Sequence, residues 1–303
     1  MLAKKAEEME HIKAELERQV VEKDRRSNEL EQEKIILEEL SETNEKNVSR
    51  ARRKYYYAIA MIAAVSAAGF MSYSYYENQV LLGTVHVGNY NSNYVIQNLR
   101  GDVVNTYVSW NVAQGTVLTV NVINQAGVSP DNLFAVKNAI LSKDPITLEN
   151  SLLNKIPATS SAVYYKGWEG ALAAASSQKT RYFIPQEFKI TDDPDGSGDI
   201  VITLTNDLNP DGLSGYTKDI ADGNQILKST ITIYNAGQLS ANQLGAITRH
   251  EFGHAMGLAH STATEDLMHP TIQTGYPYIS QCDVDALSGL YNGDKSSQVV
   301  CQN

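Results

Sequence analysis

Three histidines within residues 249–261 constrain the fold more than any other feature of the sequence. The segment reads RHEFGHAMGLAHS and contains His250, His254 and His260. Residues four apart lie on one face of a helix, so a helix would present His250 and His254 to a single metal ion. The chain must then turn back for His260 to approach, and Gly257 permits this because glycine adopts positive φ at little cost. We therefore expect a helix that ends near Gly257 beside a metal site.

The expected helix has a recognisable start. Ser240 and Gln243 stand three residues apart ahead of an apolar run, which is the pattern of a capping box. The alternative without a metal site is a helix whose histidines are ordinary surface residues. The third histidine beyond a glycine argues against it, because the whole chain has only 6 histidines.

Three nitrogen ligands leave one position of a tetrahedral zinc ion open to water, which is typical of a catalytic site and not of a structural one. Zinc can lower the pKa of bound water to about 7. Glu251 directly follows the first histidine, so its carboxylate would face this water and accept its proton as a general base. The pattern thus predicts hydrolysis by zinc-activated water.

The pattern His-Glu-x-x-His-x-x-Gly-x-x-His resembles the metzincin signature. Ser261 after the third histidine is similar to the matrixin branch, and residues 266–270 (DLMHP) resemble the matrixin methionine turn, which implies Met268 beneath the ligands. Residues 283–291 resemble the last matrixin helix. The likeness covers residues 240–291 and implies a zinc metalloendopeptidase with an α/β (α+β) metzincin-like domain, a mixed central sheet and an active-site helix.

Some residues depart from the matrixin pattern. Upstream of the helix the relevant region has only His86, so we predict one zinc ion and no second, structural one. A Pro-Arg-Cys-Gly segment is absent, which gives no support to latency through a cysteine on zinc. His269 stands where a non-ligand residue is usual and is either a proton carrier or a solvent-facing side chain. Ile272 replaces a frequent pocket tyrosine, so the cleavage preference does not carry over.

The resemblance also implies how a substrate binds. A peptide or protein segment would add as an extended strand along residues 226–234, the strand before the active-site helix. We expect hydrolysis of peptide bonds in extracellular proteins. The alternative is a non-catalytic, zinc-binding interaction module tethered to the membrane, against which the presence of Glu251 speaks.

Alternating and apolar segments predict the other elements of residues 102–303, the expected protease domain. Strands are expected at 103–110, 116–123, 199–204 and 226–234. Helices are expected at 131–141, where Ser129 and Pro130 give a start signal, at 164–175, and at 283–291.

Residues 1–54 lack proline and glycine and are rich in charge, which predicts a long helix. It is either a self-associating coiled coil or a solvated spacer. The apolar heptad positions are Met9, Ile12, Leu16, Leu30, Leu37 and Leu40, and Gln19, Lys23, Arg26 and Glu33 interrupt them.

Residues 55–76 contain no charge, and as a helix they would span about 33 Å, enough for a bilayer core. Tyrosines cluster at both ends, and the basic residues Arg50, Arg52, Arg53 and Lys54 precede the segment. We predict an uncleaved signal anchor in the cell membrane with a single pass, a cytoplasmic N-terminus and an extracellular catalytic domain. A buried helix and a cleaved signal peptide are the alternatives. Residues 77–101 would be a stalk or an N-terminal extension with extra strands.

The charge of residues 77–303 argues against one class of partner. From residue 77 onward there are 21 acidic and 12 basic residues, so nucleic acid, which needs clustered lysine and arginine, is not expected. Cys282 and Cys301 are the only cysteines, and in an exported domain such a close pair is expected to form a disulfide.

A second metal is the weaker expectation. Residues 192–199 read DDPDGSGD and place Asp192, Asp193, Asp195 and Asp199 in one glycine-containing loop. Calcium takes six to eight oxygen ligands and suits such a loop, although the spacing is not that of an EF-hand. The alternative is an acidic surface turn.

Overall fold

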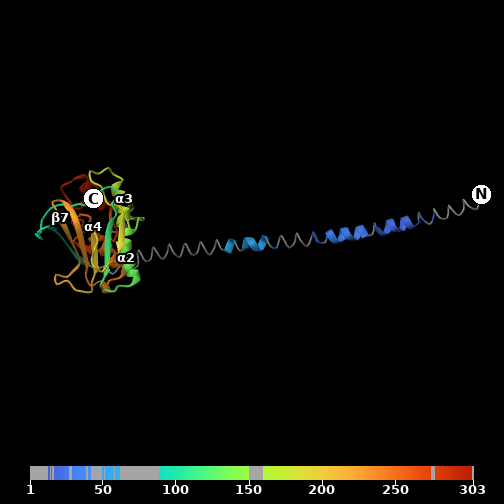
Figure 1. The fold of residues 1–303 in the computed structure, drawn as a ribbon, viewed down its shortest axis with the longest axis horizontal. Helices are drawn as coiled ribbons and strands as arrows, with labels where there is room; N and C mark the ends of the chain where they lie inside the picture. Colours follow the sequence, from blue (N-terminus) through green and yellow to red (C-terminus); the bar gives the residue numbers. More distant parts are fainter. Residues whose placement is uncertain are drawn as a thin grey trace, which may run out of the picture. The chain divides into compact units, whose positions relative to one another are not determined.

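The computed structural model describes residues 89–149, 160–273 and 277–301, together with separate helical stretches between Lys13 and Met61. The chain divides into two compact units, Met1–Gly83 and Thr84–Asn303 (Figure 1). The proposed catalytic residues all lie in the second unit.

The described residues of the first unit are helical and exposed, which agrees with the expected helix. Leu30, Leu37 and Leu40 of the predicted heptad pattern are each 62% exposed, so the structure gives no support to a coiled coil. Met9, Ile12 and Leu16 lie outside the described residues. Among the residues that the structure describes, no helix combines the length and the apolar character needed to cross a bilayer. Residues 58 and 62–76 of the predicted membrane segment lie outside them.

The second unit is built on a seven-stranded mixed sheet with the order β5-β2-β6-β8-β7-β1-β9. Strands β5, β2, β6 and β8 are parallel to one another, β7 is antiparallel to β8, and β1 is parallel to β7 and antiparallel to β9. A separate pair, β3-β4, is antiparallel. The strands are β1 (Asn89–Asn98), β2 (Leu118–Asn124), β3 (Pro145–Glu149), β4 (Ser161–Tyr165), β5 (Phe188–Thr191), β6 (Ile200–Leu204), β7 (Leu213–Asp222), β8 (Gln225–Ile233) and β9 (Thr271–Gln273).

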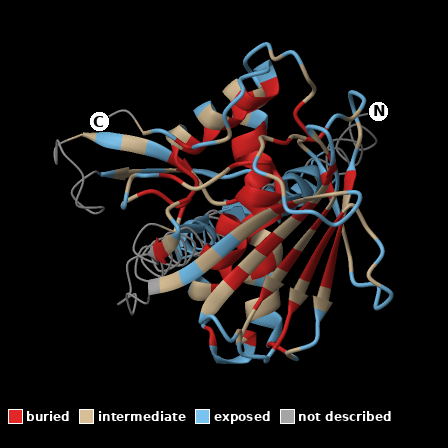
Figure 2. Ribbon diagram, turned by 90° about the vertical axis from the view of Figure 1, so that its left-hand side faces the viewer, coloured by how far each residue is buried: buried red, intermediate tan, exposed pale blue. Residues whose placement is uncertain are grey.

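The helices are α2 (Pro130–Leu141), α3 (Trp168–Ser176), α4 (Ala241–Ala255) and α5 (Gln281–Asn292), with a short 3-10 turn η2 (Ala236–Gln238) before α4. Helix α4 packs against α2 and against strands β7 and β8, so it lies inside the domain. From Leu244 to Ala255 all of its residues are buried. Figure 2 shows buried residues gathered between the sheet and the helices, with exposed residues toward the outer loops.

Two local predictions differ from the structure. Residues 103–110 form no regular strand, only single bridges at Val103 and Ser109, because they cross from β1 to the core without a continuous partner. The predicted helix at 164–175 begins later, at Trp168, because Tyr164 and Tyr165 pair in β4.

The predicted substrate-binding edge is also wrong. The strand before α4 is β8, and it pairs on both sides, with β6 and with β7. The hairpin places β7 beyond it, so β7 is the strand nearest the active-site helix on that side, and β1 pairs with its other edge.

Candidate active site

Helix α4 is fixed at both ends by groups that the sequence encodes. At its start the side chain of Ser240 accepts from the N–H of Gln243, and the Gln243 side chain accepts from the N–H of Ser240 at 2.8 Å. Toward its end the indole of Trp168 donates to the carbonyl of Arg249 at 2.8 Å. These contacts hold the helix that carries His250 and His254 at its start and near the first histidine.

A left-handed glycine turns the chain after α4. Gly257 has a φ of 98°, and a Cβ at this position would collide with the carbonyl of Val108. The N–H of Leu258 bonds the carbonyl of Gly253 at 3.0 Å, and that of Ala259 bonds Ser297 at 2.7 Å. This turn delivers His260 to the first two histidines.

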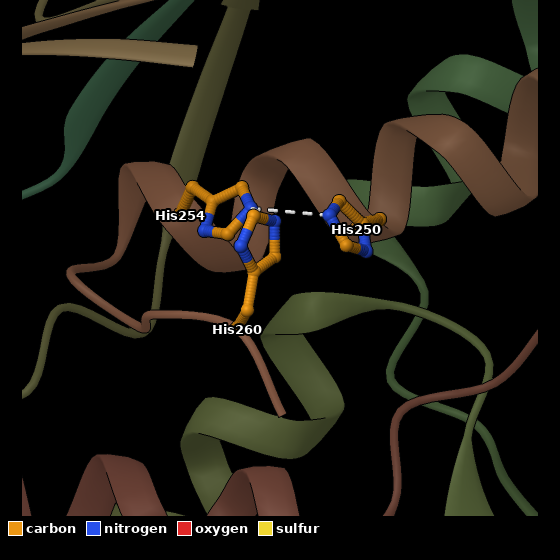
Figure 3. Close-up of side chains that lie close together, drawn as sticks. All are labelled: His250, His254 and His260. Atoms are coloured by element: carbon orange, nitrogen blue, oxygen red, sulfur yellow. Dashed lines mark hydrogen bonds between the residues drawn. The ribbon is translucent and has the colours of Figure 1, made fainter. Parts of the chain in front are cut away.

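The three imidazoles converge on one point (Figure 3). Nε2 of His254 lies 3.1 Å from Nε2 of His250 and 3.2 Å from Nε2 of His260. A zinc ion with bonds of about 2.0–2.1 Å in tetrahedral geometry separates two nitrogen ligands by about 3.4 Å. The spacing of the donors therefore fits zinc.

The second ring nitrogen of two ligands is occupied. Nδ1 of His250 lies 2.7 Å from the carbonyl of Leu267, and Nδ1 of His254 lies 2.7 Å from that of Leu258. A carbonyl only accepts, so both Nδ1 atoms carry the proton and both Nε2 atoms present lone pairs to the site. Converging lone pairs of this kind are the donor set that a metal cation would accept.

Burial keeps these rings neutral, as metal ligands must be. It lowers the pKa of His250 to about 3 and that of His260 to about 4, and it holds the pKa of His254 well below the ordinary value. No proton therefore competes with a metal ion near neutral pH.

Met268 is buried beneath the ligand helix. A side chain on Gly253 would meet the Met268 sulfur, so the glycine of the ligand helix lets the two segments pack closely. The N–H of Met268 donates to the Asp266 carboxylate at 2.9 Å, and its carbonyl accepts from Ser261 at 2.8 Å. The turn that the sequence predicted under the histidines lies there.

The carboxylate of Glu251 is fully buried, and both of its oxygens accept hydrogen bonds. Ser92 of β1 donates to Oε1 at 2.6 Å, and Thr217 of β7 donates to Oε2 at 2.6 Å. Burial raises the pKa of Glu251 to about 7. Gly215 of β7 lies so close that any side chain there would collide with this carboxylate.

A tyrosine covers one of the ligands. The ring of Tyr94 in β1 stacks on that of His254, with centroids 4.5 Å apart and planes 6° from parallel. Its hydroxyl donates to Asp219 of β7 at 2.8 Å. Asp219 is completely buried, which raises its pKa to about 7.

The sequence did not predict the residues of β1 and β7 that line the site, which are Ser92, Tyr94, Thr217 and Asp219. The alternation of NYNSNYVIQN in residues 89–98 was a signal for a strand. Its pairing with β7, more than a hundred residues away, leaves no trace in a local pattern.

The other predicted site residues are not members of the three-histidine cluster, although His269 lies near enough to lower the pKa of His250 and His260. Cys282 and Cys301 form a disulfide. His269 is half-buried, with Nδ1 accepting from the N–H of Thr271, and Ile272 is buried in β9.

The four loop carboxylates do not gather around one point. Among the described residues they are absent from the clusters able to hold a metal ion. Asp199 accepts from Thr119, and Asp195 accepts from Ser197. Calcium binding stays a prediction of the sequence.

A three-histidine site on a buried helix, closed by a glycine turn and supported by a methionine turn, defines a metzincin-type domain. Residues 169–292 match the family model for Matrixin. The chain is 32% identical to human matrix metalloproteinase-20 over 168 residues, which cover 50% of this chain and 33% of that protein. It is 36% identical to matrix metalloproteinase-18 of Xenopus laevis over 110 residues, 35% of this chain and 20% of that one.

Residues 169–292 are thus similar to the matrixins. The matched region spans about a third or less of the length of these relatives.

Proposed function

We propose that this protein is a zinc-dependent endopeptidase with Glu251 as its general base. The observation that carries the proposal is the convergence of three Nε2 atoms beside a buried carboxylate, with Nε2 of His254 3.1 Å from that of His250 and 3.2 Å from that of His260. The Matrixin match supports the same reading.

Each residue has a task in peptide hydrolysis. His250, His254 and His260 would hold the zinc ion, which when bound polarises the scissile carbonyl and acidifies water. Glu251 would accept the proton of the attacking water and return it to the leaving amine. Thr217 positions the Glu251 carboxylate through its hydrogen bond to Oε2.

The substrate class follows from the strands beside the site. β7 lies against Glu251, and the edge of β7 that β1 occupies in this structure is the one an extended segment would pair with, so an unfolded stretch of polypeptide is the expected substrate. Side-chain preference is open, because Ile272 fills the place of a frequent pocket residue.

The test measures zinc content and casein hydrolysis in the full chain, in Ser92→Ala and in Glu251→Gln. We expect one zinc ion per chain in all three proteins. At least one of the full chain and Ser92→Ala should cleave casein, and Glu251→Gln should not. One zinc ion per chain without cleavage by any form would favour the alternative, a zinc-binding interaction module.

We propose further that residues 55–76 anchor the chain in a membrane with the catalytic domain outside. The absence of charge over this segment and the basic residues before it support the proposal. Protease protection of vesicle-bound protein tests it: accessibility of both units from one side would contradict it.

Chemical cross-linking of the full chain tests self-association through residues 1–54. A change in melting temperature on adding calcium tests binding at residues 192–199.

A further inference from the structure

Strand β1 occupies the part of the sheet that faces the catalytic residues. It pairs with β7 over Asn91–Asn98 and with β9 over Asn89–Asn91. Ser92 lies in register with Gly215, the residue of β7 that touches Glu251, and Tyr94 lies in register with Thr217. The strand therefore lies along the edge that an extended substrate would use.

The inward side chains of β1 contact the catalytic groups themselves. Ser92 donates to Glu251, and two residues on Tyr94 covers the ring of His254. Alternation along a strand puts these two side chains on one face, and the exposed Asn91 and Asn93 lie on the other. With β1 in this position, Glu251 is completely buried and both its oxygens are bonded.

The connection that follows β1 is exposed, whereas the chain beyond it is firmly held. Leu99 is 64% exposed and Val103 is 69% exposed, on either side of a turn closed by the bond from Gly101 to Asn98. Trp110 is buried, and its indole donates to Ala255 at 2.8 Å. β1 thus joins the domain through an exposed turn at residues 99–103, the kind of segment that proteases cut.

We propose that β1 is an internal inhibitor that fills the substrate cleft, and that the chain becomes an active peptidase when β1 is displaced or when the turn at residues 99–103 is cut. The inhibitor works without a thiol, because both cysteines of the chain are joined in the disulfide. This inference rests on the proposed peptidase site.

A proline in β1 tests displacement. The N–H of Ser92 bonds Pro270 on the β9 side at 3.1 Å, and successive N–H groups of a strand point to opposite sides, so that of Asn93 faces β7. Asn93→Pro removes this backbone N–H donor. The side chain of Asn93 is exposed, so its replacement should not disturb packing. Asn93→Thr keeps the donor and a strand-forming residue, and it is the matched control.

In the full zinc-loaded chain, we expect Asn93→Pro to hydrolyse casein about tenfold faster than the parent, with Asn93→Thr unchanged. A synthetic peptide of residues 89–98, added in trans, should slow Asn93→Pro toward the parent rate. A folded, zinc-loaded Asn93→Pro that is no faster than Asn93→Thr would overturn the proposal, and so would a slower one.

Two further measurements keep the test decisive if Asn93→Pro does not fold. Ser92→Ala combined with Tyr94→Ala leaves the backbone intact and should give the same gain. Limited trypsin treatment of the parent should raise activity as the bond after the exposed Arg100 is cut, whereas Arg100→Gln should stay at the starting rate. Loss of the gain in both experiments would overturn the proposal.

A fluorescent peptide of residues 89–98 separates this inference from the proposed function. Binding to Asn93→Pro and not to Asn93→Thr, without hydrolysis by any form, would support the filled cleft and contradict the peptidase. Hydrolysis by the parent and by Asn93→Thr as fast as by Asn93→Pro, without peptide binding or inhibition, would support the peptidase and contradict the inhibitor.

Discussion

Two hydroxyl groups from different strands hold the carboxylate of Glu251, and they have different tasks. Ser92 belongs to β1, which we propose is displaced from the cleft on activation. Thr217 belongs to β7, which keeps its place in the sheet. A base that must face a water molecule needs one free oxygen and one that fixes its orientation. Thr217 alone therefore should orient Glu251 in the active form.

Thr217→Val removes this hydroxyl and keeps the shape of the side chain. In the Asn93→Pro chain, we expect the rate of casein hydrolysis to fall about tenfold or more with unchanged zinc content, as is usual for groups that orient active-site residues. Thr230→Val is the control, because its hydroxyl bonds the carbonyl of Lys218 away from the site. Equal rates in the two variants would show that Thr217 does not position Glu251.

Asp219 gives a prediction on pH. Burial raises its pKa from 3.8 to about 7, so the folded state binds its proton more tightly than the unfolded state. The stability contribution of this group is complete below about pH 4 and is lost as the pH rises through about 7. Asp219→Asn should therefore melt at a higher temperature than the parent at pH 8 and show a smaller difference at pH 4. Melting curves from pH 4 to 8 check this; parallel curves would contradict it.

At the scale of elements, the active-site helix and its turn were the most predictable part. The capping box of Ser240 and Gln243, the four-residue spacing of His250 and His254, and Gly257 are local signals, and each acts within one turn of chain. The start of α2 at Ser129 is of the same kind. Local signals suffice where the structure is itself local.

Pairing between distant strands was not predictable in this way. Residues 226–234 read correctly as a strand but not as an interior one, because only the pairing with β7 decides that further strands lie beyond it. The position of β1 depends on contacts with β7 and β9, and the contact of Ser92 with Glu251 depends on that position. The alternation of residues 89–98 predicts which side chains share one face of the strand, but it does not predict the strand with which they pair.

Gly257→Ala tests the turn that delivers His260. Alanine would be strained at positive φ by about 1–2 kcal/mol and would also collide with the carbonyl of Val108. Gly223→Ala, also at positive φ but in open space, carries the backbone strain alone. We expect Gly257→Ala to lower the melting temperature more and to weaken zinc binding as well. Equal effects in the two variants would show that the close approach to Val108 is unimportant.

For the whole molecule, the C-terminal tail supports the proposed metal site. Cys301 is tied to Cys282 at the start of α5, and between the two the tail passes the third ligand: Val299 bridges Ser261, and Ser297 accepts from Ala259. The tail thus supports the segment that carries His260.

Replacing both cysteines by alanine should reduce the free energy of unfolding by about 3 kcal/mol, as expected for a closed loop of this length. Zinc should also dissociate at lower chelator concentration, because the support of His260 loosens. Denaturant unfolding and chelator titration measure the two effects. Unchanged stability with intact zinc binding would mean that the tail is held by its other contacts alone.

The most direct measurement compares Glu251→Gln with its parent in the Asn93→Pro chain, with zinc quantified in both and casein hydrolysis as the readout. We predict one zinc ion per chain in each and a rate about 10²–10⁴ lower in Glu251→Gln, the usual contribution of a general base. Equal rates would contradict the role of Glu251, and a folded chain that binds no zinc would contradict the three-histidine site.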